Sequence, residues 1–522
     1  MKKLINSVVL ASTILFVSCG NDVLEPYTPG SLTEEVALTT SDDVNRLLNF
    51  SYNQLTNRTE AVFASVFTDE VGIGYANGGQ GLNSEWVFFM NTAQPGPVTL
   101  WNMNYFALAR LNRVIKYADE ITPLNANDAA RLKNMKAEAL VMRAYCHLRI
   151  LSYFSPNPKD DNALAGILAN KIFLPQEKQN PRAKNAEFYT LIHQDLDAAI
   201  ATFTANNTVF NPVYANINFA RGLKARAYMF KGDYTNAEKW ADEVITKSGL
   251  TLANPAQYRQ MFFSDNQPST VEVIFKFKRT NNQNSQATNL HNGWSSIAPN
   301  FAGSPFYEVG RSLHNLLNPT NISGANIATQ IPDVRAGVII APTSVVNPNY
   351  ATSSDFRNSD VLVINKHGGT FSEASTAVST ATNAFNNDLK IMRLSEMYLI
   401  KAEARAEASD FPGVVTALKF ITDARGAAAP TLPTSKAEAF AQILTERRKE
   451  LAFEGFRYLD LKRLGAIAGV SVNRDPADYS SSSANFPGAN PSNLPINSYK
   501  WTLPIPQDEL NVNPNIQQNP GY

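Results

Sequence analysis

The chain has 522 residues, and its 46 lysines and arginines balance 46 aspartates and glutamates to a formal net charge of +0. That balance argues against a nucleic-acid-binding protein, because phosphate contacts need a basic surface. Hydrophobic residues make up 44% of the chain and charged residues only 18%, so the sequence can form a large core covered mainly by uncharged polar side chains.

The first residues are typical of an export signal. Lys2 and Lys3 precede an apolar run, residues 4–17, which is shorter than the roughly 20 residues needed to cross a bilayer. The segment Phe-Val-Ser-Cys ends at Cys19 and resembles a bacterial lipobox, in which the cysteine carries lipid and anchors the protein to a membrane. An ordinary secretory signal is the alternative. The predicted parts are a signal peptide, a lipidated tether and a single body, at residues 1–18, 19–40 and 41–522.

Apolar residues at helical spacing predict several helices in the first half of the body. The predicted helices span residues 42–55, 101–121, 128–154 and 187–203. The first should begin after an N-cap at Ser41, and the third contains Cys146, which we expect to be a buried apolar residue. Residues 68–97 are rich in glycine and asparagine, and we interpret them as a functional loop.

Residues 219–249 match the spacing of a tetratricopeptide repeat. Small residues such as Ala225 and Ala237 let two helices approach closely, and Gly232 marks the turn between them. A weaker copy spans residues 393–426. Two such hairpins on either side of an insertion predict one continuous helical scaffold.

The insertion, residues 251–388, loses helical periodicity. Two segments in it, 271–279 and 361–366, are predicted strands. The remainder is rich in Asn, Ser, Thr, Gly and Pro and carries isolated aromatic residues. A loop of this length inside a compact domain is usually functional.

Residues 443–465 contain the densest mixture of charged and large apolar side chains in the chain. Their pattern predicts a helix, a hinge at Gly455 and a second helix. Acidic and basic residues are close enough in sequence to pair along the helix face. They are Glu446, Glu450, Glu454, Arg447, Arg457 and Arg463.

Five segments carry motifs of a known family. They are a Pro-Arg step before a Tyr-x-x-Ile-x-x-Asp-Leu helix, the helix RLSEMYLIKAEARA, an Arg-Gly corner, a Glu-Gly-x-Arg block and a Gln-Asn-Pro-Gly-Tyr ending, at residues 180–200, 393–406, 417–426, 443–465 and 501–522. Together with the lipobox, these motifs follow the order of the SusD/RagB family, the outer-membrane nutrient-binding lipoproteins of Bacteroidetes. The chain resembles that family over nearly its whole length.

The resemblance implies a mainly α-helical SusD-like fold, in which four tetratricopeptide-like hairpins support a loop-rich ligand face with a few short strands. It also implies a division of the body into parts at about 41–250 and 251–522. The function implied is capture of a glycan at the cell surface and its delivery to a SusC-like TonB-dependent transporter in the outer membrane. Peptide capture is the alternative within the family.

Catalysis is a further alternative, because a glycoside hydrolase needs two carboxyl groups about 5 to 9 Å apart across the sugar. Glu450 and Glu454 are the candidates, but on one helix their side chains point the same way, so we expect a structural role. None of the 5 histidines stands in a metal-binding spacing, and the sequence contains no nucleophile elbow or phosphate-binding motif. The sequence therefore predicts no enzyme and no cofactor. A scaffold for other proteins, built from tetratricopeptide repeats, is the last alternative.

Aromatic residues in the loops are the clearest indication of a ligand site, because sugars pack their C–H faces on rings while amides take their hydroxyls. Trp86 and Trp294 lie in loops rich in glycine and asparagine, and we predict that they form a stacking platform beside Asn83 or Asn292. Further candidates for ligand contact are Tyr75, His291 and Tyr307. The tryptophans expected to be structural are Trp101, Trp240 and Trp501.

Overall fold

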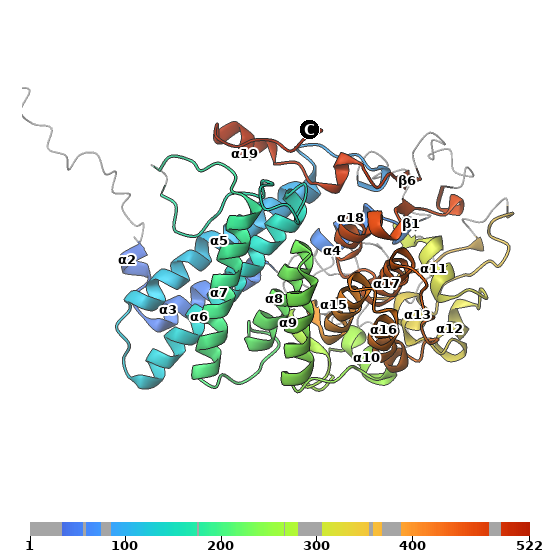
Figure 1. Cartoon of the computed structure of the whole chain (residues 1–522), viewed down its shortest axis with the longest axis horizontal. Helices are drawn as coiled ribbons and strands as arrows, with labels where there is room; N and C mark the ends of the chain where they lie inside the picture. Colours follow the sequence, from blue (N-terminus) through green and yellow to red (C-terminus); the bar gives the residue numbers. More distant parts are fainter. Residues whose placement is uncertain are drawn as a thin grey trace, which may run out of the picture.

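Helices dominate the computed structural model (Figure 1), which confirms the predicted fold class. The residues described are 34–55, 59–74, 85–174, 177–265, 267–279, 305–353, 359–367, 388–479 and 492–522. The helices of the first half are α2 Glu34–Ala37, α3 Ser41–Gln54, α4 Thr59–Val66, α5 Pro95–Glu120, α6 Ala126–Phe154 and α7 Asn185–Ala205.

The boundaries of these helices follow from local capping. Thr40, not Ser41, is the N-cap of α3, because its side chain accepts a hydrogen bond from the backbone N–H of Asp43 while the Asp43 carboxylate accepts one from the N–H of Thr40. Helix α6 packs on both α5 and α7, which places the long predicted helices side by side. The segment predicted as tether ends in the short helix α2, where Glu34 forms an ion pair of 2.6 Å with Arg113 of α5.

Two helical hairpins form the centre of the molecule. Helices α8 Ile217–Lys231 and α9 Tyr234–Lys247 are joined at Gly232, whose φ of 80° is the left-handed conformation that favours glycine. The second hairpin consists of α15 Leu394–Glu407 and α16 Phe411–Arg425. Helix α9 packs directly against α15, so the two hairpins adjoin in space despite the insertion between them in sequence.

The insertion contains more helix than its sequence predicts. Its short helices are α10 Pro255–Phe263, α11 Arg311–Leu317, α12 Gly324–Gln330 and α13 Val334–Ile339. Helices of six to nine residues span too few turns to show a clear period, so the prediction of lost helicity is wrong here. The strand predicted at 271–279 is confirmed as β2 Val273–Phe277, which pairs antiparallel with β4 Leu389–Arg393. The strand predicted at 361–366 is wrong, because only the isolated bridges Val345–Val361 and Ile340–Ile364 form there.

The last part of the chain has the predicted helix, hinge and helix. Helix α17 Lys436–Leu451 and helix α18 Arg457–Ala468 flank Gly455, which has a φ of 92°. A short hairpin of β5 Val472–Asn473 and β6 Asn493–Leu494 follows, and then α19 Gln507–Val512 near the C-terminus.

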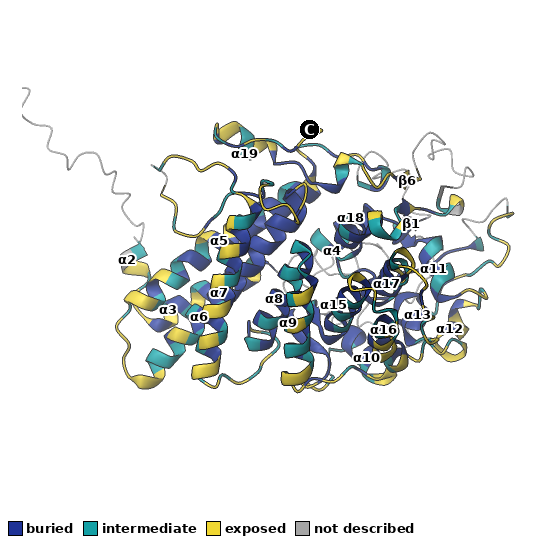
Figure 2. Ribbon diagram, in the orientation of Figure 1, coloured by how far each residue is buried: buried dark blue, intermediate teal, exposed yellow. Residues whose placement is uncertain are grey.

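The largest core of buried side chains runs from α3 to α9 and on into the C-terminal half (Figure 2). A smaller core lies among α15 to α18, and two minor ones lie in the insertion. Trp101, Trp501 and Cys146 lie in the main core, and Trp240 is half-buried against it, with the Lys224 ammonium 4.4 Å from its ring centroid. These placements confirm the structural roles predicted for them. Within the described ranges, no helix has the length and apolarity to cross a membrane.

Candidate functional site

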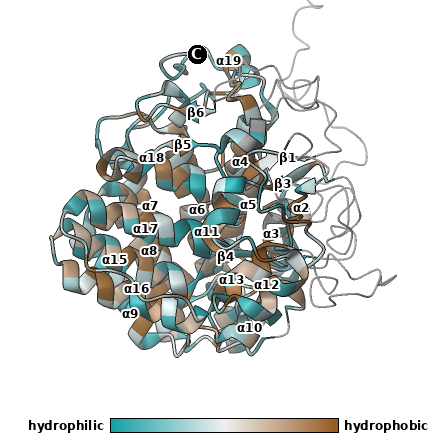
Figure 3. Cartoon of the chain, turned by 90° about the vertical axis from the view of Figure 1, so that its right-hand side faces the viewer, coloured by the Kyte–Doolittle hydropathy of each residue, from teal (hydrophilic) through white to brown (hydrophobic). Residues whose placement is uncertain are grey.

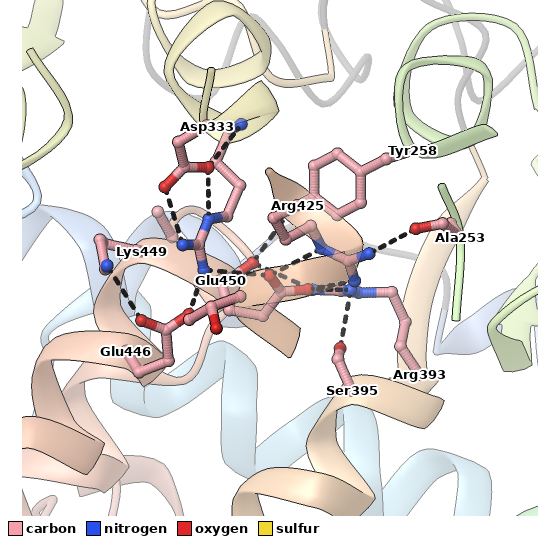
Figure 4. Close-up of polar contacts among 12 residues, drawn as sticks. Ala253, Tyr258, Asp333, Arg393, Ser395, Arg425, Glu446, Lys449 and Glu450 are labelled. Atoms are coloured by element: carbon pink, nitrogen blue, oxygen red, sulfur yellow. Dashed lines mark hydrogen bonds and ion pairs between the residues drawn. The ribbon is translucent and has the colours of Figure 1, made fainter. Parts of the chain in front are cut away.

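Glu446, Glu450 and Glu454 lie in a buried cluster of charged side chains, and Figure 4 shows the first two with their partners. Glu450 Oε1 lies 2.7 Å from Arg393 Nη1 and 2.8 Å from Arg425 Nη2, and its Oε2 lies 3.4 Å from Arg335 Nη1. Glu272 bridges the two guanidiniums of Arg393 and Arg425 from the other side. The side chain of Glu450 is fully buried.

Opposite charges balance in this cluster. Its five cations are Arg335, Lys366, Arg393, Arg425 and Lys449, and its five carboxylates belong to Glu272, Asp333, Glu446, Glu450 and Glu454. A buried cluster with matched charges and hydrogen bonds costs far less free energy than an unpaired buried ion.

The cluster has a structural role. Burial by itself raises the pKa of Glu450, but the guanidiniums of Arg425 and Arg393 outweigh burial and hold that pKa well below its usual range. Glu454 is similarly paired with Arg393 and Lys366. Neither carboxylate faces the other across an open cleft, so the pair does not have the arrangement that glycoside hydrolysis requires.

The three arginines predicted to pair with Glu446, Glu450 and Glu454 have other partners, so that prediction is wrong. Arg447 and Arg463 both pair with Asp460 and Glu403, and Arg457 makes a bidentate ion pair with Asp69. The partners of Glu450 come instead from α13, α16 and β4. Helical spacing identifies which residues share a face, but it does not identify what packs on that face.

A two-stranded pairing brings together the roots of the two predicted ligand loops. Strand β1 Val71–Ile73 pairs antiparallel with β3 Tyr307–Val309 (Figure 3), and the N–H of Gly74 donates a 3.0 Å hydrogen bond to Phe306 O. A side chain on Gly74 would collide with the backbone of Pro305. Residues 74 and 305 therefore lie side by side at one edge of this pairing.

Trp86 is fully buried in the structure. It lies in the short turn Glu85–Val87, and the Arg474 guanidinium stacks 4.5 Å from its ring centroid and 4.4 Å from that of Phe88. Arg474 is itself fixed by hydrogen bonds to the carbonyls of Thr68 and Val66, at 2.9 and 3.0 Å. The ring of Trp86 therefore offers no open face to a sugar in this conformation, contrary to the expected platform.

Tyr307 is also buried, at 7% exposure, and the ring of the half-buried Phe306 packs edge-on against it with centroids 4.9 Å apart. Burial raises the pKa of its hydroxyl above the usual range. Its placement in β3 gives it a packing role at the root of the loop.

The remaining candidates lie outside the described residues: Tyr75, Asn83, His291, Asn292 and Trp294. Cys19 lies outside them as well.

Arg474 covers the ring of Trp86, and sequence analysis did not predict this contact. It follows β5, more than 380 residues beyond Trp86, and nothing in its local sequence distinguishes this buried arginine from an exposed one. Over the described ranges, no group of three or more His, Cys, Asp or Glu side chains is arranged so that it could hold a metal ion.

Glu70 is a buried carboxyl group directly before β1. Burial raises the pKa of Glu70 to about 7, although Ser65 Oγ donates a 2.7 Å hydrogen bond to its carboxylate and opposes the shift. Its neighbour Asp69 is the group that pairs with Arg457, so the carboxylate of Glu70 is left with weaker partners.

Glu70→Gln should flatten the dependence of stability on pH. Between about pH 4.5 and 7 the carboxyl is ionised in the unfolded chain and protonated in the folded one, so the free energy of unfolding of the wild type falls as pH rises. Glutamine resembles the protonated acid and escapes that loss, which is on the order of 2 kcal/mol. Urea denaturation at pH 5 and pH 8 measures the difference, and equal slopes in both proteins contradict the raised pKa.

Comparison with known proteins gives a consistent result over the whole body. The model of the SusD family matches residues 225–522, and a second family model, described as starch-binding and associating with the outer membrane, matches residues 34–228. SusD-like protein P38 of Formosa agariphila is 22% identical over 90% of this chain and 94% of its own length.

Solved structures resemble this fold over more than nine-tenths of the chain. A SusD superfamily protein from Bacteroides thetaiotaomicron superposes with a TM-score of 0.71 at 23% identity, covering 92% of this chain and 100% of the other. A laminarin-binding SusD-like protein superposes with a TM-score of 0.61 at 19% identity, covering 93% and 100%. At these identities the likeness establishes the fold.

Proposed function

The chain belongs to the SusD family, and on that basis we propose that it captures a glycan at the outer membrane and delivers it to a SusC-like TonB-dependent transporter. Three findings support the class of ligand and the location. One matching family model is described as starch-binding and associating with the outer membrane, and one structural neighbour is a laminarin-binding protein. The third is the sequence that resembles a lipobox, because a lipidated Cys19 would anchor the protein and leave its body in water.

The observation that carries the proposal is the shared root of the two loops. Because β1 and β3 pair, residues 74 and 305 lie at one edge, and the sequences next to them, 75–84 and 280–304, are rich in amide residues and contain Tyr75 and Trp294. Rings and amides from two loops can then act on one ligand. With Trp86 buried under Arg474, Trp294 becomes the main proposed stacking residue, with Tyr75 and His291 as further contacts.

We propose that the protein binds its ligand without cutting it. The two carboxylates that the sequence offered for hydrolysis are ionised within a buried cluster and are committed to arginine partners. Peptide capture is the alternative ligand class for the same loops, and it has no separate structural support.

Trp294→Ala should weaken glycan binding about tenfold, because loss of one stacked ring removes about 1 to 2 kcal/mol. Isothermal titration of the full chain with laminarin and with soluble starch oligosaccharides measures this effect. The melting temperature should not change. Trp240→Phe is the matched control, since Trp240 lies on α9 beneath Lys224 and away from β1 and β3.

Two results would redirect the proposal. Unchanged affinity in Trp294→Ala removes this ring from the site. Binding of casein-derived peptides, with no affinity for either glucan, favours the peptide alternative over the glycan.

A further inference from the structure

A groove lies on the helical scaffold between α3 and α6, away from the loop face. Its cavity of about 390 Å³ has an apolar floor formed by Leu48 and Met135. Its walls are amides, from Asn45 and Asn49 on α3 and from Asn127 and Asn134 on α6. No part of the function proposed above uses this groove.

The walls follow the helical repeat. Asn45 and Asn49 are four residues apart on α3, and the α6 wall continues from Asn127 through Asn134 to Glu138 on one face. Eleven residues of helix at 1.5 Å each give the groove a length of about 16 Å. That shape suits an extended chain of several sugar rings better than a compact metabolite.

The amides are available to a ligand. The side chains of Asn45, Asn49 and Asn127 make no hydrogen bond to the part of the chain that the structure describes. The side chain of Asn134 is held by two residues that do not line the groove: its Oδ1 accepts hydrogen bonds of 2.8 Å from Asn206 and 3.1 Å from Thr208. Free amides beside an apolar floor match a ligand that presents both hydroxyls and C–H faces.

One aromatic ring, that of Tyr214, lines the groove. Tyr214 is 44% exposed, and its ring packs edge-on against that of Tyr52, with centroids 6.1 Å apart. The hydroxyl of Tyr52 donates a 2.8 Å hydrogen bond to Glu138 and accepts one of 2.9 Å from the N–H of Ala215. The exposed ring and the acid of the groove wall are therefore positioned by the same buried tyrosine.

The groove carries little net charge. Arg131, which lines it, pairs with Asp42 at 2.6 Å. Burial raises the pKa of Glu138 to about 7, although the hydrogen bond from the Tyr52 hydroxyl opposes that shift. Such a surface has no strong field to select an acidic or a basic ligand.

We propose that this groove is a second binding site for a neutral oligosaccharide, in which Tyr214 stacks on a sugar ring and Asn45 and Asn49 bind hydroxyl groups. The inference rests on the proposed function only for the class of ligand, since its location and residues are independent of the loops. Two separated sites on one chain would raise the avidity for a long polysaccharide.

Titration of the full chain with laminarihexaose and maltohexaose tests the groove. The wild type should bind more than one equivalent of one of these sugars. Tyr214→Ala should weaken one site about tenfold through loss of the stacked ring, and Asn49→Ala about fivefold through loss of one hydrogen bond. Both positions are exposed, so neither change should alter the melting temperature.

Tyr499→Ala is the matched control, because Tyr499 is also 44% exposed and packs edge-on against a second tyrosine, Tyr522, at 5.0 Å. A single site that is lost in Trp294→Ala and unchanged in Tyr214→Ala overturns the groove inference while the proposed function stands. A single site with the opposite behaviour supports the groove and removes the loop platform. Absence of binding to either sugar counts against both.

Discussion

Glu450→Ala should lower the free energy of unfolding by about 3 to 5 kcal/mol, the usual cost of leaving a buried ion pair without one partner. The substitution removes the carboxylate between Arg393 and Arg425 and also the longer contact to Arg335. Glu272 can neutralise only part of the remaining positive charge. Urea denaturation followed by circular dichroism measures the loss.

The matched control is Asp423→Ala on α16, the helix that also carries Arg425. Asp423 pairs with Lys419 four residues away, but both side chains are more than half exposed, so we expect a change of no more than about 0.5 kcal/mol. Glycan affinity of the folded Glu450→Ala protein should match that of the wild type. A stable variant that no longer binds glycan would instead place Glu450 in the ligand site.

Arg182→Met should release the C-terminal segment from the body. Arg182 is buried, at 7% exposure, and its guanidinium donates hydrogen bonds of 2.9 Å to the carbonyls of Phe154 and Ala165. It also binds Gln517 O at 3.2 Å and Asn519 Oδ1 at 2.9 Å. Loss of several buried hydrogen bonds at once costs on the order of 3 kcal/mol.

Limited proteolysis with mass spectrometry detects the release, since cleavage near residues 503–522 should become faster than in the wild type. Lys178→Met removes a positive charge from the same connecting loop, but Lys178 is exposed, so the C-terminal segment should stay protected. Equal protection in Arg182→Met would show that the segment is held by Asn519 and its carbonyl partners alone.

The long helices were predictable because each carries a repeated apolar face and a recognisable end. Residues 128–154 and the turn at Gly232 are examples, since several turns of helix or a required left-handed glycine leave a clear pattern. The short helices α11 to α13 were missed because one or two turns leave no such pattern. The resemblance to SusD/RagB proteins implied the overall fold class more fully than periodicity did.

The candidate sites were less predictable, since they depend on contacts between distant segments. Trp86 has the composition of a loop residue, yet Arg474 covers its ring from the far end of the chain. The same difficulty applies to Glu450, whose partners lie 25 to 115 residues away. The groove of Asn49 and Tyr214 likewise joins two helices and a connecting loop that no local pattern relates.

The charged cluster also bears on the order in which the protein folds. Its members span the chain from Glu272 to Glu454, so its ion pairs form only after long intervening segments have closed, at a cost in chain entropy. Interactions that form after the folding transition state act mainly by slowing unfolding. We therefore expect the cluster to lower the rate of unfolding more than it raises the rate of folding.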